Sequence, residues 1–98
     1  MTIYALSSGP GASGVAVIRL SGIDTSKVIK LMTGKELPRP RVATLRKINK
    51  INTSELIDEG LILWFPGPES YTGEDMAEIQ VHGSKAVVDA LHSSLSEI

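Results

Sequence analysis

Runs of apolar residues predict five strands along the chain. Short apolar runs that end at Ser, Gly or Pro are typical of strands. The continuous run from Gly60 to Phe65 is expected for a central strand that is covered on both faces. Met76 to His82 alternates, with apolar side chains on one face and polar ones on the other. The remaining strands are predicted at Ile3 to Leu6, Val15 to Leu20 and, with poorer alternation, Arg41 to Ile48.

In two segments the apolar residues recur at the spacing of an amphipathic helix. The first has Asp24 or Thr25 as an N-cap and Gly34 as a stop signal, and the second begins at Gly83 and Ser84. The order β-β-α-β-β-β-α predicts an α+β domain, with a mixed β-sheet of about five strands and two helices packed on it. The predicted core-facing residues are Val28, Leu31 and Met32 in the first helix and Val88, Leu91, Leu95 and Ile98 in the second.

Length and composition fit one soluble domain that spans residues 1–98. Of the 98 residues 42% are hydrophobic and 21% charged, and the absence of cysteine excludes disulfides, thiolate zinc sites and cysteine nucleophiles. No apolar run approaches the roughly 20 residues that cross a bilayer, and the first residues lack the pattern of a signal peptide. We therefore expect a cytoplasmic protein without membrane contact. Because the second helix stops on its apolar stripe without a cap, we also expect a piece of a longer protein.

The charges are unevenly distributed, although the formal net charge is only −1. The segment from Lys35 to Lys50 has six basic residues and one acid, whereas Ile51 to His82 has seven acids and neither Lys nor Arg. Such a split either steers a charged partner or is neutralised within the fold. The basic segment lacks the interleaved aromatic residues of a nucleic-acid platform, so that interpretation is weak.

The glycine-rich segment from Gly9 to Gly14 matches the GxGxxG string of dinucleotide-binding loops. That motif has to open a helix, so that the helix N-terminus faces the phosphates. Here the strand-forming run Val15 to Ile18 follows instead, and no Lys-Ser/Thr pair of a Walker loop comes after Gly14. We therefore expect a connection within a hairpin rather than a nucleotide site.

The loop from Gly67 to Asp75 carries more chemistry than a turn requires, since it also holds a Tyr, a Thr and three carboxylates. Arg19 lies in an otherwise apolar strand and needs a carboxylate or an anionic ligand, unless it reaches water at the strand end. Together with Glu78 these groups suit a small polar heterocycle with an acidic tail. A carboxylate can accept N–H hydrogen bonds from the edge of the heterocycle, and Arg19 can pair with its acidic tail. The ring of Tyr71 can stack on the heterocycle. The alternative is a polar face that is simply solvated.

A metal site has less support. Glu74, Asp75, Glu78 and His82 are close in sequence and of ligating types. In a strand, however, Glu78 and His82 lie roughly 13 Å apart, too far to share one ion. We therefore predict no metal site. Two histidines without partners of known geometry do not indicate a Ser-His-Asp arrangement, so we predict no catalytic residue either.

Three motifs carry a family resemblance, and Tyr4-Ala5 also matches. They are Gly-Val-Ala-Val-Ile-Arg-Leu-Ser-Gly (Gly14 to Gly22) after the glycine loop, Leu61 to Pro66 followed by Gly-Pro-Glu-Ser-Tyr-Thr-Gly-Glu-Asp, and Glu-Ile-Gln-Val-His-Gly (Glu78 to Gly83). In this order and spacing they resemble the N-terminal domain of the tRNA-modification GTPase family MnmE, also called TrmE. The likeness covers nearly the whole chain and is uninformative only from Lys47 to Leu56.

The resemblance implies a folate-binding and homodimerising domain, similar in fold to the tetrahydrofolate-binding domains of one-carbon enzymes. The implied ligand is 5-formyl-tetrahydrofolate or another tetrahydrofolate derivative. Carried over by motif, Arg19 holds the anionic tail or orders the loop, and Glu78 meets the pterin edge. The implied pocket-lining residues are Tyr71, Thr72, Gly73 and Glu74.

The resemblance also implies what the rest of the protein does. A helical domain and a G domain with GTP, Mg and K would follow residue 98 and are absent from this chain. With a flavoprotein of the MnmG type, the full protein would modify the wobble uridine of tRNA. This chain has no P-loop and is not expected to be catalytic alone. The alternative is a purely structural dimerisation domain without a ligand.

Overall fold

The computed structural model describes residues 2–6, 14–51 and 53–97 of the chain. Within these residues five strands and two helices follow one another in the predicted order, which confirms the α+β class. Most of the glycine-rich segment lies outside the described residues, so the prediction for that loop stays a prediction. The elements are β1 (Thr2–Leu6), β2 (Val15–Gly22), α1 (Thr25–Thr33), β3 (Thr44–Asn49), β4 (Leu56–Phe65), β5 (Met76–His82) and α2 (Lys85–Leu95).

The strands form one sheet in the order β1-β2-β5-β4-β3, and all four pairings are antiparallel. The prediction of a mixed sheet therefore needs correction. Strands β3, β4 and β5 follow one another through loops, which makes each an antiparallel neighbour of the next. The segment containing α1 carries the chain across to the far edge, so that β5 enters between β2 and β4. As a result β5, and not β4, is the central strand.

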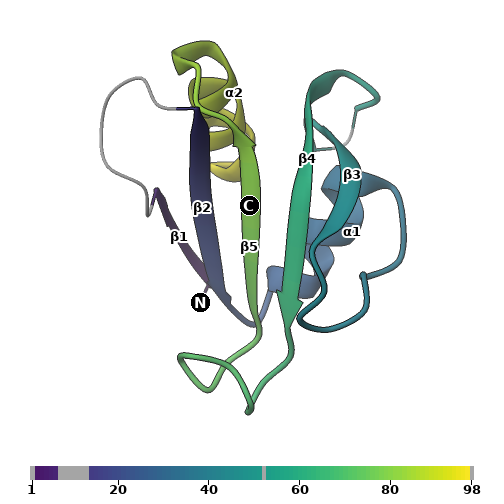
Figure 1. Cartoon of the computed structure of the whole chain (residues 1–98), viewed down its shortest axis with the longest axis vertical. Helices are drawn as coiled ribbons and strands as arrows, with labels where there is room; N and C mark the ends of the chain where they lie inside the picture. Colours follow the sequence, from purple (N-terminus) through teal and green to yellow (C-terminus); the bar gives the residue numbers. More distant parts are fainter. Residues whose placement is uncertain (1, 7–13, 52, 98) are drawn as a thin grey trace.

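Both helices pack on one face of the sheet, behind the strands in Figure 1, and leave the opposite face open. Leu61 and Leu63 of β4 alternate with core residues, point to the open face and are only half-buried. The prediction that Gly60 to Phe65 is covered on both faces is therefore wrong, because the helices cover one face alone. The core between the two layers includes Ile18, Ile62 and Ile79 from the strands and Val28, Ile29, Met32 and Leu91 from the helices.

Two helix ends follow their predicted signals, whereas Asp24, at the N-cap of α1, makes no capping hydrogen bond through its side chain. Gly34 adopts a left-handed φ of 66° and closes α1 by donating its N–H to a carbonyl of the last turn over 2.8 Å. Ser84 caps α2, since its Oγ accepts the N–H of Val87 over 3.2 Å. On the predicted core face of α1, however, Leu31 is 40% exposed. Ile29 lies in the core instead, because the helix turns Ile29 toward the sheet and Leu31 away from it.

Two strand boundaries differ from the prediction. Strand β3 begins at Thr44 rather than at Arg41, because Arg41 adopts a left-handed φ of 63° that does not fit a strand. Strand β4 begins at Leu56, well before Gly60, and its first residues pair with the end of β3.

Helix α2 places Leu91 and Leu95 in the core, as predicted, with Val88 packed against the core. Ile98 lies outside the described residues. Neither described helix has the length and the apolar character needed to cross a membrane.

Candidate functional site

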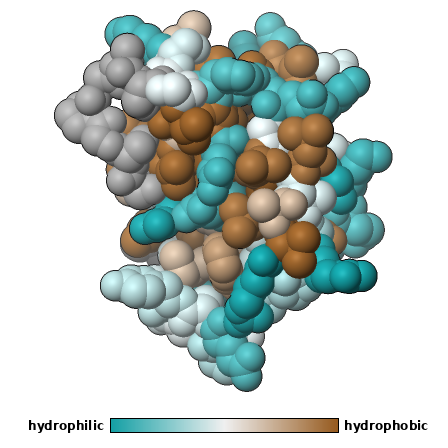
Figure 2. Space-filling view, viewed as in Figure 1, coloured by the Kyte–Doolittle hydropathy of each residue, from teal (hydrophilic) through white to brown (hydrophobic). Residues whose placement is uncertain are grey.

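The open face of the sheet combines charged and apolar side chains. Arg19 of β2 lies opposite Glu78 of the central strand β5, and Glu78 lies opposite Leu63 of β4. Figure 2 shows this face, where apolar side chains in brown are interrupted by hydrophilic ones. The face therefore presents both charge and apolar area to a ligand or partner.

Arg19 and Glu78 form an ion pair on this face. Nε of Arg19 donates to Oε1 of Glu78 over 2.9 Å, so Arg19 meets a carboxylate as predicted, although its side chain is 57% exposed and also reaches water, which was the alternative. Nε2 of Gln80 donates to the other carboxylate oxygen over 2.9 Å. Partial burial acts to raise the pKa of Glu78, but the hydrogen bonds from Gln80 and Arg19 and the charge of Arg19 outweigh it and hold that pKa below its ordinary value. Glu78 is thus an ionised carboxylate in a fixed orientation.

The loop between β4 and β5 is shaped by its own hydrogen bonds and extends beyond the lower end of the sheet in Figure 1. At its base the N–H of Gly67 donates to the carboxylate of Asp75 over 2.9 Å. At its tip the hydroxyl of Ser70 donates to the carbonyl of Glu74. Gly73 between them has a φ of 83°, a conformation that a side chain rarely allows. The loop therefore has a defined shape of its own.

Thr72 and Glu74 point from the loop toward the end of β2. Oγ of Ser21 lies 2.8 Å from Oγ1 of Thr72, and it makes a longer contact of 3.5 Å with Oε2 of Glu74. Ser21 itself pairs with Met76, where β5 begins. These contacts fasten the loop to the sheet close to Arg19.

A cavity of about 650 Å³ lies between this loop and the open face. Its volume is within the range of small-molecule sites. Arg19, Tyr71 and Glu78 line it, whereas the other predicted site residues, at positions 72 to 74, do not. The side chain of Tyr71 is 97% exposed, which leaves its ring free to stack on a ligand. The other lining residues are Arg41, Phe65, Glu69, Ser70 and Met76.

Sequence reasoning missed the apolar floor of the cavity. Phe65 and Met76 form it as register partners at the adjoining ends of β4 and β5. The alternation of β5 carried a usable signal, because Met76 shares the face of Glu78.

Sequence reasoning also missed Arg41, which enters the cavity wall from the connector before β3. Its N–H donates to the carbonyl of Trp64 over 2.9 Å, and its guanidinium Nη2 donates to the carbonyl of Glu69. No pattern in the sequence marks this residue, since its position depends on a left-handed backbone conformation.

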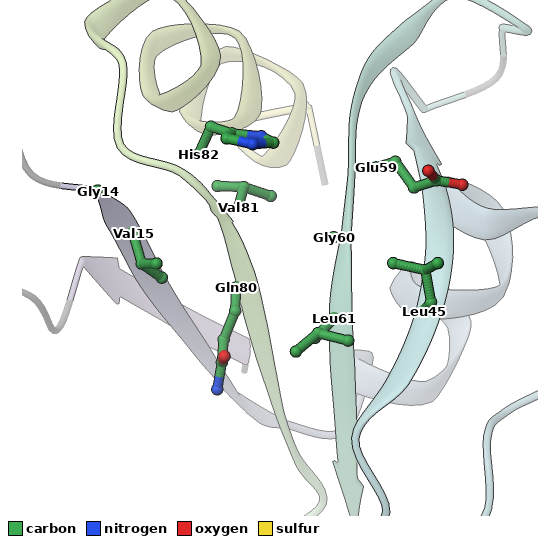
Figure 3. Close-up of a pocket in the computed structure, with 9 residues that line it drawn as sticks. All are labelled: Gly14, Val15, Leu45, Glu59, Gly60, Leu61, Gln80, Val81 and His82. Atoms are coloured by element: carbon green, nitrogen blue, oxygen red, sulfur yellow. The ribbon is translucent and has the colours of Figure 1, made fainter.

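A smaller cleft of about 250 Å³ opens at the other end of the same face, where β4 and β5 diverge (Figure 3). At Gly60 the strands approach so closely that a Cβ would lie 2.1 Å from the carbonyl oxygen of Gln80. Beyond that point the carboxylate of Asp58 accepts the backbone N–H of His82 over 2.8 Å and lies 2.9 Å from its ring Nδ1. These bonds join the diverging strand ends, and the cleft is smaller than most small-molecule sites.

Comparison with known sequences identifies the family. The profile of the family described as "GTP-binding protein TrmE N-terminus" matches residues 2–98. The chain belongs to this family. The resemblance drawn from the three sequence motifs is therefore confirmed.

Relatives from distant organisms agree with this assignment. The chain is 78% identical over 98 residues to the tRNA modification GTPase MnmE of Pelagibacter ubique, and the match covers 100% of this chain and 22% of that protein. It is 52% identical over 96 residues to MnmE of Maricaulis maris, and the match covers 98% of this chain and 22% of that protein. It is 48% identical over 97 residues to a mitochondrial subunit of 5-taurinomethyluridine-[tRNA] synthase from Danio rerio. That match covers 99% of this chain and 19% of the relative. The chain thus spans about a fifth of the length of these relatives.

Proposed function

We propose that this TrmE N-terminal domain binds 5-formyl-tetrahydrofolate, or another one-carbon tetrahydrofolate, in the cavity beside the β4–β5 loop. The observation that carries the proposal is the meeting of a fixed carboxylate, an exposed aromatic ring and guanidinium groups in one cavity of about 650 Å³. A reduced folate has matching parts, which are a guanidine-like pterin edge, a ring that stacks and an anionic glutamate tail.

Glu78 is the group that we assign to the pterin edge. Arg19 and Gln80 each donate to one of its oxygens, so the carboxylate is held in one orientation. Each oxygen keeps a further acceptor position for the N–H groups of the ring edge. Phe65 and Met76 provide an apolar floor, and Tyr71 supplies an aromatic face at the rim.

Thr72, Gly73 and Glu74 act in this proposal through the shape of the loop. Thr72 and Glu74 contact Ser21 at the end of β2, and Gly73 supplies the left-handed turn between them. Their role is to keep Tyr71 beside the cavity, while Tyr71 and Glu78 contact the ligand and Arg19 holds the carboxylate of Glu78 in place.

We also propose that a second copy of the chain covers the open face. Ile3, Val15 and Leu45 are 62%, 52% and 58% exposed, and each alternates along its strand with residues that face the helices. Exposed apolar side chains gathered on one face are typical of an interaction surface. Pairing of the same face from two copies gives a symmetric homodimer.

The chemistry of the longer protein is a further part of the proposal. The names of the relatives assign tRNA modification and GTPase activity to those longer proteins. In our proposal a separate G domain hydrolyses GTP with Mg and K, and a flavoprotein of the MnmG type joins in modifying the wobble uridine of tRNA. The domain described here is then the module that holds the folate.

Calorimetric titration with 5-formyl-tetrahydrofolate tests the folate proposal. We expect saturable binding, and we expect Glu78→Gln to weaken it at least about tenfold, because hydrogen bonds to a charged group contribute about 1.5–3 kcal/mol. Glu59→Gln is the matched control. Glu59 is an exposed carboxylate of the same sheet that lines the smaller cleft instead, so its removal should leave the affinity unchanged.

Sedimentation of the same samples tests the homodimer. A dimer that releases no heat at millimolar folate would leave only the structural dimerisation domain as an interpretation. If a monomer binds the folate, the proposed homodimer is rejected and the folate-binding proposal is retained.

A further inference from the structure

Arg41 is the second guanidinium of the cavity, and main-chain contacts hold it there. Its N–H donates to the carbonyl of Trp64 over 2.9 Å, which fixes the connector beside the end of β4. Its φ of 63° is rare for a residue with a side chain and turns the chain toward β3. Its Nη2 donates to the carbonyl of Glu69 in the β4–β5 loop. Arg41 therefore lies where the connector, β4 and the loop meet.

The two arginines of the cavity have different partners. Arg19 is engaged with the carboxylate of Glu78. The bond from Arg41 goes to a neutral carbonyl, and none of the carboxylates in the described part of the chain forms an ion pair with it. A guanidinium has five N–H donors. Arg41 consequently keeps a positive charge and donors for a further anionic group.

We infer that Arg41 is the specificity-determining residue for the carboxylate tail of the ligand. The inference rests on the proposed folate function and divides the recognition between two arginines. Arg19 positions Glu78 for the ring edge, and Arg41 binds a carboxylate of the tail, a pairing for which the planar guanidinium is well shaped. The sequence-based assignment of the anionic tail to Arg19 thus passes to Arg41.

The test uses a variant that keeps the backbone conformation. Arg41→Asn removes the charge, and asparagine tolerates the left-handed conformation better than most residues. Arg39→Asn is the matched control, because Arg39 is an exposed arginine of the same connector that does not line the cavity. The two probes are 5-formyl-tetrahydrofolate and its dimethyl ester, which keeps the ring system and removes the tail charges.

We expect the full wild-type chain to bind the free acid about tenfold more tightly than the ester, as a charge-assisted pair implies. Arg41→Asn should bind the acid about tenfold more weakly and the ester with unchanged affinity, so that the preference disappears. Arg39→Asn should keep the wild-type preference.

Several results would overturn the inference. An equal loss for acid and ester in Arg41→Asn would mean that Arg41 only supports the loop, and an unchanged preference would mean that the tail lies elsewhere. If the thermal midpoint of Arg41→Asn falls, Arg41→Gly repeats the comparison without a side chain in the left-handed region. If the wild type binds the acid and the ester equally, the inference about the tail charge is refuted, while the folate proposal stands. A wild type that binds neither refutes the folate proposal itself.

Discussion

The two faces of the sheet are built from the same strands and have different roles. Ile18 and Ile79 face the helices and are 0% and 1% exposed. Their neighbours in the chain, Arg19 and Glu78, face the other way and form the ion pair of the cavity. Because side chains alternate along a strand, the stability of the fold and the chemistry of the site lie one residue apart. Substitutions on the open face should therefore change binding, and substitutions on the covered face should change folding.

Adjacent residues of β4 provide the most direct test of this division. Ile62 is 1% exposed in the core, whereas Leu61 is half-buried on the open face. We expect Ile62→Ala to lower the free energy of unfolding by about 3–4 kcal/mol, since it removes buried methyl groups and leaves a cavity. Leu61→Ala should cost about 1 kcal/mol, because less of its apolar area leaves water on folding. Urea unfolding of both variants measures the difference. Equal costs would mean that the open face is packed as tightly as the core.

Gly60 tests how closely β4 must approach the central strand β5. A Cβ at Gly60 would lie 2.1 Å from the backbone oxygen of Gln80, whereas one at Gly14 would meet nothing within 4 Å. Gly60→Ala should therefore cost about 2–3 kcal/mol through forced displacement of the backbone. Gly14→Ala is the control and should leave the unfolding midpoint in urea nearly unchanged. A similar midpoint for both variants would show that β4 and β5 separate without penalty.

Local signals account for what could be predicted of the fold. The alternation of β5, the cap at Ser84 and the stop at Gly34 each depend on residues within a few positions of one another, and all three are confirmed. The order of the strands was not predictable in this way, because β2 pairs with β5 across a long stretch of chain. The continuous run from Gly60 to Phe65 indicated burial on both faces, but an apolar run does not reveal whether a second layer belongs to the same chain.

The site was predictable only in part for related reasons. A carboxylate partner for Arg19 was predicted from the cost of an unpaired charge in a strand buried on both faces. Arg19 lies instead on the open face with 57% of its side chain exposed, and its partner follows from the register of β2 with β5. The direction of Thr72 and Glu74 depends on the left-handed turn at Gly73 and on contacts with Ser21. A residue such as Arg41, which adopts a left-handed conformation without being glycine, has no sequence signature.

Substitutions at Arg41 can separate the effect of its left-handed backbone conformation from the effect of its charge. A β-branched side chain is poorly tolerated at a φ of 63°, so Arg41→Val should lower the free energy of unfolding by about 1–2 kcal/mol. Arg41→Gly should stay within about 0.5 kcal/mol of the wild type, because relief of strain offsets the greater freedom of glycine in the unfolded chain. Thermal unfolding measures both. If the two variants were equally stable, the backbone at this position would not be constrained.

The smallest expected effect is the pH dependence that the open-face ion pair gives to stability. Partial burial is outweighed by the hydrogen bonds from Gln80 and Arg19, so the pKa of Glu78 in the folded chain lies below its ordinary value of 4.5. A carboxyl group with a lowered pKa contributes stability that is complete above its ordinary pKa and is lost as the pH falls through the folded one. The wild type should therefore lose stability below pH 4.5 more steeply than Glu78→Gln does.

Urea midpoints measured at neutral pH and at several values below pH 4.5 would resolve this difference in slope. Arg19→Gln should reduce the slope as well, since it removes the second of the two hydrogen bonds and the charge that lower the pKa of Glu78. Parallel curves for the wild type and both variants would mean that the pair contributes nothing to folding. The division between the two faces would then be complete, with the stability of the fold carried by the covered face. A difference at neutral pH as large as that of Ile62→Ala would instead make the open face part of the stabilising core.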